Sequence, residues 1–110
     1  MVKTIGRALG LALVILLLHQ AQTPLRAVSL RITKSCAGCR LRAVHISNAD
    51  LAGADLRNAD LRWARLESVN LNGANLEGAN LRHARLYDVT TKDTNFCGAT
   101  LMDAAKGYCQ

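Results

Sequence analysis

The stretch that decides the fold is Ala49-Asp50-Leu51-Ala52-Gly53-Ala54-Asp55-Leu56-Arg57-Asn58-Ala59-Asp60-Leu61, in which leucine returns at every fifth position. The register continues outward in both directions without an insertion, and every fifth position except Thr91 is large and apolar. These positions are Leu41, Ile46, Leu51, Leu56, Leu61, Leu66, Leu71, Leu76, Leu81, Leu86, Thr91, Phe96 and Leu101. The residue two places before each of them is small or β-branched. One five-residue unit therefore repeats from Cys39 to Asp103.

A period of five residues fits neither an α-helix nor a flat sheet. In a helix, successive repeats rotate by roughly 140°, so no face of the helix stays apolar. In a straight strand, positions five apart point to opposite faces, which would place every second leucine in water. The pattern is satisfied when the chain turns a corner once per repeat and points both the small residue and the leucine inward. The repeat therefore predicts a coil wound around its own apolar core.

Three repeats show the unit most clearly: Ala49-Asp50-Leu51-Ala52-Gly53, Ala74-Asn75-Leu76-Glu77-Gly78 and Ala79-Asn80-Leu81. This pattern of a small residue, Asp or Asn, Leu and two variable positions resembles the unit of the pentapeptide-repeat family. The resemblance covers residues 39–103 and implies an all-β fold, a right-handed quadrilateral β-helix with four repeats per coil and about three coils. The two end regions resemble the caps of exported cyanobacterial members, some of which reside in the thylakoid lumen.

The N-terminal segment has the layout of a signal peptide. Lys3 and Arg7 precede an apolar run from Ala8 to Leu18, which is shorter than the ~20 residues that span a bilayer as a helix. We expect a signal peptide over residues 1–21, with cleavage after Ala21 or, as the alternative, after Ala27. The mature chain would then have no membrane span and would lie in the periplasm, in the thylakoid lumen or outside the cell.

A short coil needs covered ends, because its first and last leucine layers would otherwise face water. We expect residues 22–38 to form an N-terminal cap, with a helix that starts at Thr23-Pro24 and covers the first coil. Its apolar residues are Leu25, Val28 and Ile32. We expect residues 104–110 to form a C-terminal cap, in which Asp103 begins a single helical turn that stops at Gly107 before the tail folds back.

The four cysteines form one pair at each end of the repeats, and bridged residues need Cα atoms within ~7 Å. Local disulfides are therefore expected, Cys36 with Cys39 and Cys97 with Cys109. The same separation prevents all four thiolates from sharing one zinc ion. The Cys36-Ala37-Gly38-Cys39 motif is also typical of redox proteins, although no βαβ pattern surrounds it. Thiol-disulfide exchange at this pair is the alternative function.

Stacking of residues twenty apart would gather positive charge at one corner. Arg42, Arg62 and Arg82 would form one column and His45, Arg65 and Arg85 the next, with Ala43, Trp63 and His83 close by. We name Arg42, Arg62, Trp63, Arg65, Arg82 and Arg85 the basic strip. One interpretation is a solvated face whose charge Asp60 and counterions relieve, as Glu77 relieves Arg57 elsewhere. The other is a binding strip, because arginine pairs with carboxylates and phosphates through two parallel hydrogen bonds.

Nothing in the sequence indicates catalysis, a metal or a cofactor. Its serines lack a motif that places a base beside them, and Asp50, Asp55 and Asp60 occupy the ordinary repeat position. A coil filled with leucine is also expected to have no pocket. The net charge of +6 includes Lys3 and Arg7 of the signal segment, and the remaining excess suits an unknown, acidic protein partner. Export disfavours nucleic acid, and a basic chain departs from the acidic family members that imitate DNA. The predicted function is a non-catalytic interaction or scaffold module.

Overall fold

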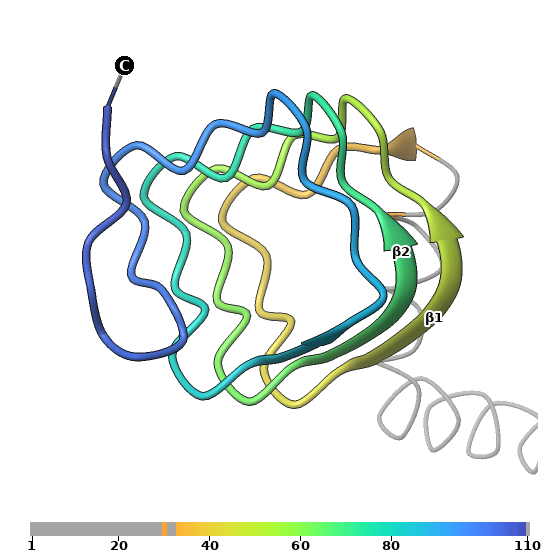
Figure 1. The fold of residues 1–110 in the computed structure, drawn as a ribbon, viewed down its shortest axis with the longest axis horizontal. Helices are drawn as coiled ribbons and strands as arrows, with labels where there is room; N and C mark the ends of the chain where they lie inside the picture. Colours follow the sequence, from red (N-terminus) through yellow and green to blue (C-terminus); the bar gives the residue numbers. More distant parts are fainter. Residues whose placement is uncertain (1–29, 31–32, 110) are drawn as a thin grey trace, which may run out of the picture.

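The computed structural model describes Leu30 and residues 33–109. Its strands are β1 (His45–Asp50), β2 (Arg65–Asn70) and β3 (Arg85–Tyr87), which form one sheet in the order β1-β2-β3. All neighbours are parallel and pair residues twenty apart, so that Ile46 lies beside Leu66 and Leu66 beside Leu86. Figure 1 shows the three strands stacked along one side of a coiled chain.

The other sides of the coil keep the same register through single parallel bridges. Ser35, Asp55, Asn75 and Asn95 form one such ladder, and Arg40, Asp60, Asn80 and Thr100 form another. Asn70 bridges Thr90 on a further side. Four five-residue repeats therefore make one turn of the coil, and the described part of the chain is a strand-rich β-helix with almost no helix. This arrangement explains the period of five, because each repeat is one short side followed by a corner.

Where a repeat carries Asp or Asn before its leucine, that side chain caps the corner that follows. The Oδ1 atom of Asp50 accepts a hydrogen bond from the amide of Ala52 at 3.1 Å, and Asp60 and Asn80 do the same for the residues two places on. Such side-chain turns favour short amide or carboxylate side chains. The second corner residue often adopts a left-handed conformation, as Gly53 does at φ +69 and Trp63 at φ +62.

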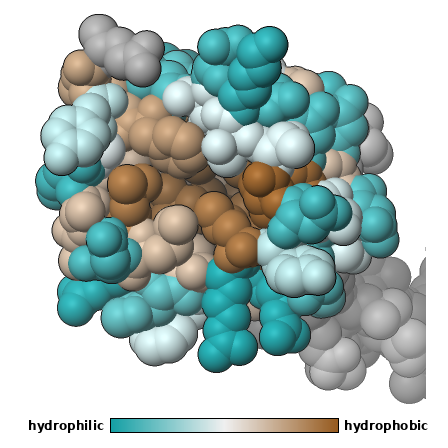
Figure 2. All heavy atoms as spheres, viewed as in Figure 1, coloured by the Kyte–Doolittle hydropathy of each residue, from teal (hydrophilic) through white to brown (hydrophobic). Residues whose placement is uncertain are grey.

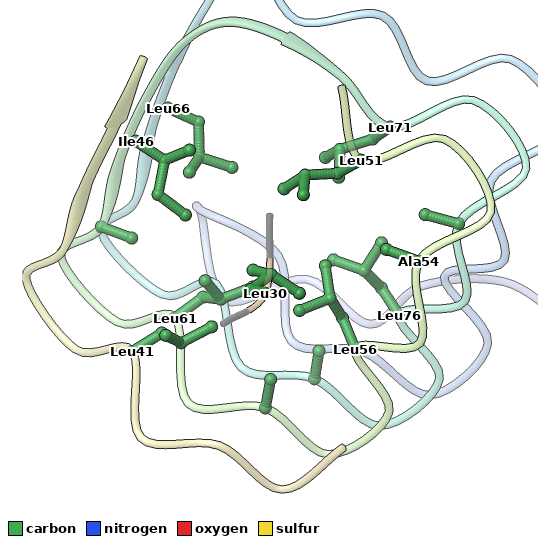
Figure 3. Close-up of a cluster of buried hydrophobic side chains, with 14 of the residues drawn as sticks. Leu30, Leu41, Ile46, Leu51, Ala54, Leu56, Leu61, Leu66, Leu71 and Leu76 are labelled. Atoms are coloured by element: carbon green, nitrogen blue, oxygen red, sulfur yellow. The ribbon is translucent and has the colours of Figure 1, made fainter. Parts of the chain in front are cut away.

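The core is a column of apolar side chains inside the coil, shown in Figure 3. The leucines from Leu41 to Leu81, Ile46 and the small residues from Val44 to Ala79 are buried, and among the described residues no polar or charged side chain is buried. The predicted inward positions are confirmed over these turns. The last turn differs, because Leu86, Val89, Phe96 and Leu101 are only partly buried and Thr91 is exposed.

At the N-terminal end, the described residue that covers the first turn is Leu30, which is fully buried. Its carbonyl accepts a hydrogen bond from the amide of Lys34 at 2.8 Å, and both Leu30 and Thr33 are helical. The expected signal peptide and the expected cap residues Leu25, Val28 and Ile32 lie outside the described residues. Leu30 was not among the apolar positions selected for the predicted helix.

At the C-terminal end, the predicted helical turn after Asp103 is wrong. Ala104 has a φ of +67, and the Oδ1 atom of Asp103 accepts a hydrogen bond from the amide of Ala105, so the chain reverses instead of continuing as a helix. Lys106 then pairs antiparallel with Thr100, and the amide of Gly107 donates to the carbonyl of Ala99 at 2.8 Å. A side chain at Gly107 would collide with the carbonyl of Phe96. The tail folds back against one side of the last turn (Figure 1).

Candidate interaction surface

The twenty-residue register brings the basic strip together at one corner of the coil. The amide of Ala43 donates to the carbonyl of Arg62 at 2.8 Å, and the amide of Trp63 donates to that of Arg82 at 3.1 Å. In the adjacent sheet, Arg65 pairs with both His45 and Arg85. The backbone therefore holds both arginine columns side by side along the stacking direction.

Two of the five arginines are already engaged by carboxylates. Arg62 donates two hydrogen bonds to Asp60, at 2.8 Å from Nε and 2.7 Å from Nη2. These hydrogen bonds hold the pKa of Asp60 below its ordinary value, and the charge of Arg42 contributes in the same direction. Arg65 Nε lies 3.3 Å from Glu67 Oε1. Arg62 and Arg65 are therefore partly neutralised within the chain.

Glu67 also approaches His45, which pairs with Arg65 in the sheet but is not part of the basic strip. His45 Nε2 lies 3.2 Å from Glu67 Oε2. Sequence reasoning did not single out Glu67. The signal was available, because Glu67 lies two positions after Arg65 in the same strand and its side chain is on the same face of the sheet. Of the strip arginines, Arg42, Arg82 and Arg85 have no ion pair with any residue that the structure describes.

The aromatic residue of the strip is held by a stacking contact. The Trp63 ring lies over His83, with centroids 4.3 Å apart and planes inclined by 28°. Trp63 nevertheless remains 55% exposed. Both residues adopt a positive φ, which is uncommon for bulky side chains and is maintained here by the repeated corner. The indole therefore occupies a defined position between the arginine columns while much of its surface stays accessible.

The expected pairing of Arg57 with Glu77 is wrong in its principal contact. Arg57 instead donates two hydrogen bonds to Asp55, at 2.8 Å and 2.7 Å. Those from the Arg57 side chain, followed by one from its backbone amide, lower the pKa of Asp55 to about 2. Glu77 acts on Arg57 only as a more distant charge that helps to raise the arginine pKa. Asp55 is the partner of Arg57 because both residues lie at the same corner.

Another side of the coil carries a ladder of polar side chains in place of arginine. Asn70 donates from Nδ2 to Asp50 at 3.3 Å, and the hydroxyl of Thr90 donates to Asn70 Oδ1 at 3.2 Å. Lys34 lies 3.5 Å from Asp50 at the N-terminal end of this ladder. These side chains satisfy one another along the stack. The cations of the repeats that form no ion pair with a described residue are Arg42, Arg82 and Arg85 of the basic strip and Arg40 and Lys92 outside it.

The disulfides are local, as expected. Cys36 is joined to Cys39, with Cα atoms 5.2 Å apart, and Cys97 to Cys109, with Cα atoms 4.3 Å apart. The first bridge spans a tight turn in which the Cys39 amide donates to the Cys36 carbonyl and Gly38 has a φ of +68. Cys36 is buried in the core, so this cysteine of the candidate redox pair also packs against the core side chains.

The C-terminal end contains a hollow that the sequence did not predict. Its volume is about 690 Å³, and the last turn and the folded-back tail line it. The expectation of no pocket is therefore wrong at this end. Leu30 and residues 33–109 contain no group of three His, Cys, Asp or Glu side chains that could hold a metal ion. In that same part of the chain, no helix has the length and apolar character needed to cross a membrane.

The sequence profile described as Pentapeptide repeats matches in eight copies over residues 35–73 and 59–103. The chain belongs to the pentapeptide-repeat family. The match includes every residue of the basic strip, both cysteines of the Cys36–Cys39 disulfide and Cys97. Cys109 and the rest of the tail lie outside it.

Solved pentapeptide-repeat structures resemble this member of the family. HetL of the cyanobacterium Nostoc sp. strain PCC 7120, a protein involved in regulation of heterocyst differentiation, is 27% identical over 66% of this chain and 40% of HetL, with a TM-score of 0.36. A protein of the Arabidopsis thaliana thylakoid lumen is 27% identical over 59% of this chain and 49% of that protein, with a TM-score of 0.32. Rfr23 of the cyanobacterium Cyanothece 51142 is 24% identical over 73% and 83% of the two chains, with a TM-score of 0.38. This chain thus spans less than half the length of the first two. Comparison with curated proteins found no match.

Proposed function

We propose that this pentapeptide-repeat protein is a non-catalytic, exported module that binds the acidic surface of another protein through its basic strip. Its scaffold is a right-handed quadrilateral β-helix of about three coils with a short cap at each end, and residues 1–21 act as a signal peptide. The observation that carries the proposal is that Arg42, Arg82 and Arg85 form no ion pair with any residue the structure describes and lie beside the half-exposed Trp63.

The chemistry of the strip suits a carboxylate-rich surface. A guanidinium group and a carboxylate form two parallel hydrogen bonds, and the pair Arg62–Asp60 already adopts this geometry within the chain. Arginine and tryptophan are the residues most often found to dominate binding energy at protein interfaces. Because the backbone ladder holds both columns in register, little backbone order has to be gained on binding, and the ordering cost is confined to the arginine side chains.

The family context supports a binding role more than an enzymatic one. Pentapeptide-repeat proteins are typically non-enzymatic. Two local disulfides in a short chain are typical of an oxidising compartment. The thylakoid-lumen origin of one similar structure agrees with export but is a property of that protein.

The test compares two variants with the same change in charge. Arg42→Glu/Arg82→Glu alters the strip, whereas Lys34→Glu/Lys92→Glu alters two lysines at another corner of the coil, near Ala52 and Asn72. On immobilised polyglutamate, the wild type and the lysine variant should be retained at low salt and released as ionic strength rises. The strip variant should bind at least about tenfold more weakly, a loss of about 1.4 kcal/mol.

Folding of both variants is checked by circular dichroism, because exposed charges contribute little to stability. Equal loss of binding in the two variants would show that net charge alone drives retention, and the strip would then be an ordinary solvated face. Preferential binding of the strip to duplex DNA over polyglutamate would also contradict a protein partner.

A further inference from the structure

The C-terminal end of the coil presents an apolar layer that the folded-back tail leaves incompletely covered. Leu86, Val89 and Phe96 are only partly buried, whereas the equivalent residues of the preceding turn are buried. Within the described residues, three of the four exposed large hydrophobic side chains belong to this last turn and the tail, namely Tyr87, Met102 and Tyr108. Exposed aromatic residues around an apolar floor are typical of an interaction site.

The same end also exposes an unpaired strand edge. In the preceding turn, the amides of Leu71, Gly73 and Leu76 each donate at 2.8 Å to a carbonyl of the last turn. Twenty residues later, the amides of Thr91, Asp93 and Phe96 have no acceptor among the described residues, and the carbonyls of Val89 and Thr94 have no donor.

The tail closes only the neighbouring segment. Gly107 pairs with Gly98 and Ala99, and the carbonyl of Ala105 accepts from the amide of Leu101. We define residues 89–96 as the open edge: no backbone hydrogen bond from the described tail reaches it, and Gly107 packs only against its last residue, Phe96. A further strand laid along the open edge would find alternating donors and acceptors already oriented along the coil axis.

The hollow beside the open edge has a distinct chemical character. Its lining combines apolar groups, including Phe96, Leu101 and Tyr108, with the carboxylates of Glu77 and Asp93, and no lysine or arginine lines it. Figure 2 shows apolar atoms gathered in a central depression and surrounded by hydrophilic side chains. Its volume of about 690 Å³ lies within the range of small-molecule clefts, and the hollow is open to solvent.

We propose that this end binds an extended, basic peptide segment by strand addition. The peptide backbone pairs with the open edge, an apolar or aromatic peptide side chain enters the hollow, and flanking lysine or arginine side chains lie near Glu77 and Asp93. Main-chain pairing supplies affinity and the alternating side chains supply specificity, as in other cases of strand addition. The site is separate from the basic strip and does not depend on the function proposed for it.

The shape and charge of the hollow favour a peptide over a second copy of this chain. A symmetric pairing of two C-terminal ends would set one concave surface against another and bring Glu77 and Asp93 close to the same carboxylates of the partner. Like charges that face one another across an interface are unfavourable. A single extended strand is convex enough to enter the hollow and carries the opposite charge in a basic peptide.

The test uses the full chain with both disulfides intact and the blocked peptide Lys-Val-Phe-Val-Lys. Two matched peptides serve as controls, one with glutamate in place of lysine and one with proline in place of valine. Binding of the basic peptide should shift the amide NMR signals of Thr91, Asp93 and Phe96. The glutamate and proline peptides should each bind at least about tenfold more weakly.

The protein variants separate edge pairing from side-chain contacts. Thr91→Pro removes an amide that makes no bond within the described chain, so it should weaken peptide binding at least about tenfold, whereas Thr91→Ala should not. Asp93→Asn removes one carboxylate at a position with φ +57 that asparagine accepts readily, and it should reduce the preference for the basic peptide. Arg42→Glu/Arg82→Glu should leave binding at this end unchanged.

Several results would overturn the proposal. Equal binding of the lysine and glutamate peptides, equal binding of the proline peptide, or the absence of any shift at the open edge would each exclude basic strand addition. Concentration-dependent dimerisation that protects the same three amides from hydrogen exchange would assign the open edge to a second copy. If Thr91→Pro does not fold, the peptide controls and Asp93→Asn still decide the outcome.

Discussion

Replacing Leu61 by alanine measures how tightly the repeat core is packed. Leu61 is 1% exposed and lies in the column formed by Leu41, Leu81 and Leu101. Main-chain hydrogen bonds of 2.8 Å hold its turn to the turns below and above, from the amide of Leu41 to the carbonyl of Asp60 and from the amide of Leu61 to that of Asn80. The walls therefore cannot easily close around a missing side chain, and we expect a loss of about 3 to 4 kcal/mol in the free energy of unfolding.

Leu101→Ala is the matched control, because Leu101 belongs to the same column but lies in the last turn beside the hollow and is only partly buried. Its truncation removes less buried surface and leaves no enclosed cavity, so the expected loss is about 1 kcal/mol. Urea unfolding of both oxidised variants, followed by circular dichroism, gives the two values. A loss at Leu61 no greater than the loss at Leu101 would refute the assigned column and the role of the ladder in preventing collapse.

Two further outcomes follow from the ends and the corners of the coil. Peptide mapping without reduction should show Cys36 joined to Cys39 and Cys97 to Cys109, and Cys97→Ser/Cys109→Ser should lower the free energy of unfolding by about 3 kcal/mol, because that bridge closes a loop between residues twelve apart. A bond from Cys39 to Cys97 would contradict the stacked geometry. Because Arg57 lowers the pKa of Asp55 to about 2 from the ordinary value of 3.8, the ionised pair stabilises the fold above pH 3.8 and loses this contribution as the pH falls towards 2. The melting temperature of Arg57→Gln should fall less steeply across this window than that of the wild type, and parallel profiles would show that the pair has no effect on stability.

The sequence by itself determines the inward positions of the core. The apolar residues that recur every five positions can all be buried only when every repeat turns a corner. Where Asp or Asn precedes the leucine, its side chain caps that corner. Once residues twenty apart stack, the positions of the basic strip follow from their numbers. Local cysteine pairing follows in the same way, because the length of the repeat separates the two ends.

The tertiary structure alone decides the details that depend on competition between neighbours. Arg57 has carboxylates within its own repeat and in the turn above, and the pairing with Asp55 emerges only when side-chain rotamers are placed. Glu67 likewise engages Arg65 in its own strand and His45 in the neighbouring strand. These contacts determine which arginines have no ion pair, and the amino-acid composition cannot predict which ones those are.

The ends of the coil are also decided by tertiary structure, because the repeat pattern stops there. The tail after Asp103 contains residues that are compatible with a helical turn, yet pairing with Thr100 and Ala99 offers its backbone hydrogen bonds that a single isolated turn cannot supply. Leu30 covers the first turn, whereas the last turn keeps an open edge and a hollow. The five-residue period specifies the interior of the coil. The closure of each end depends on contacts between the repeats and end segments that do not follow the repeat.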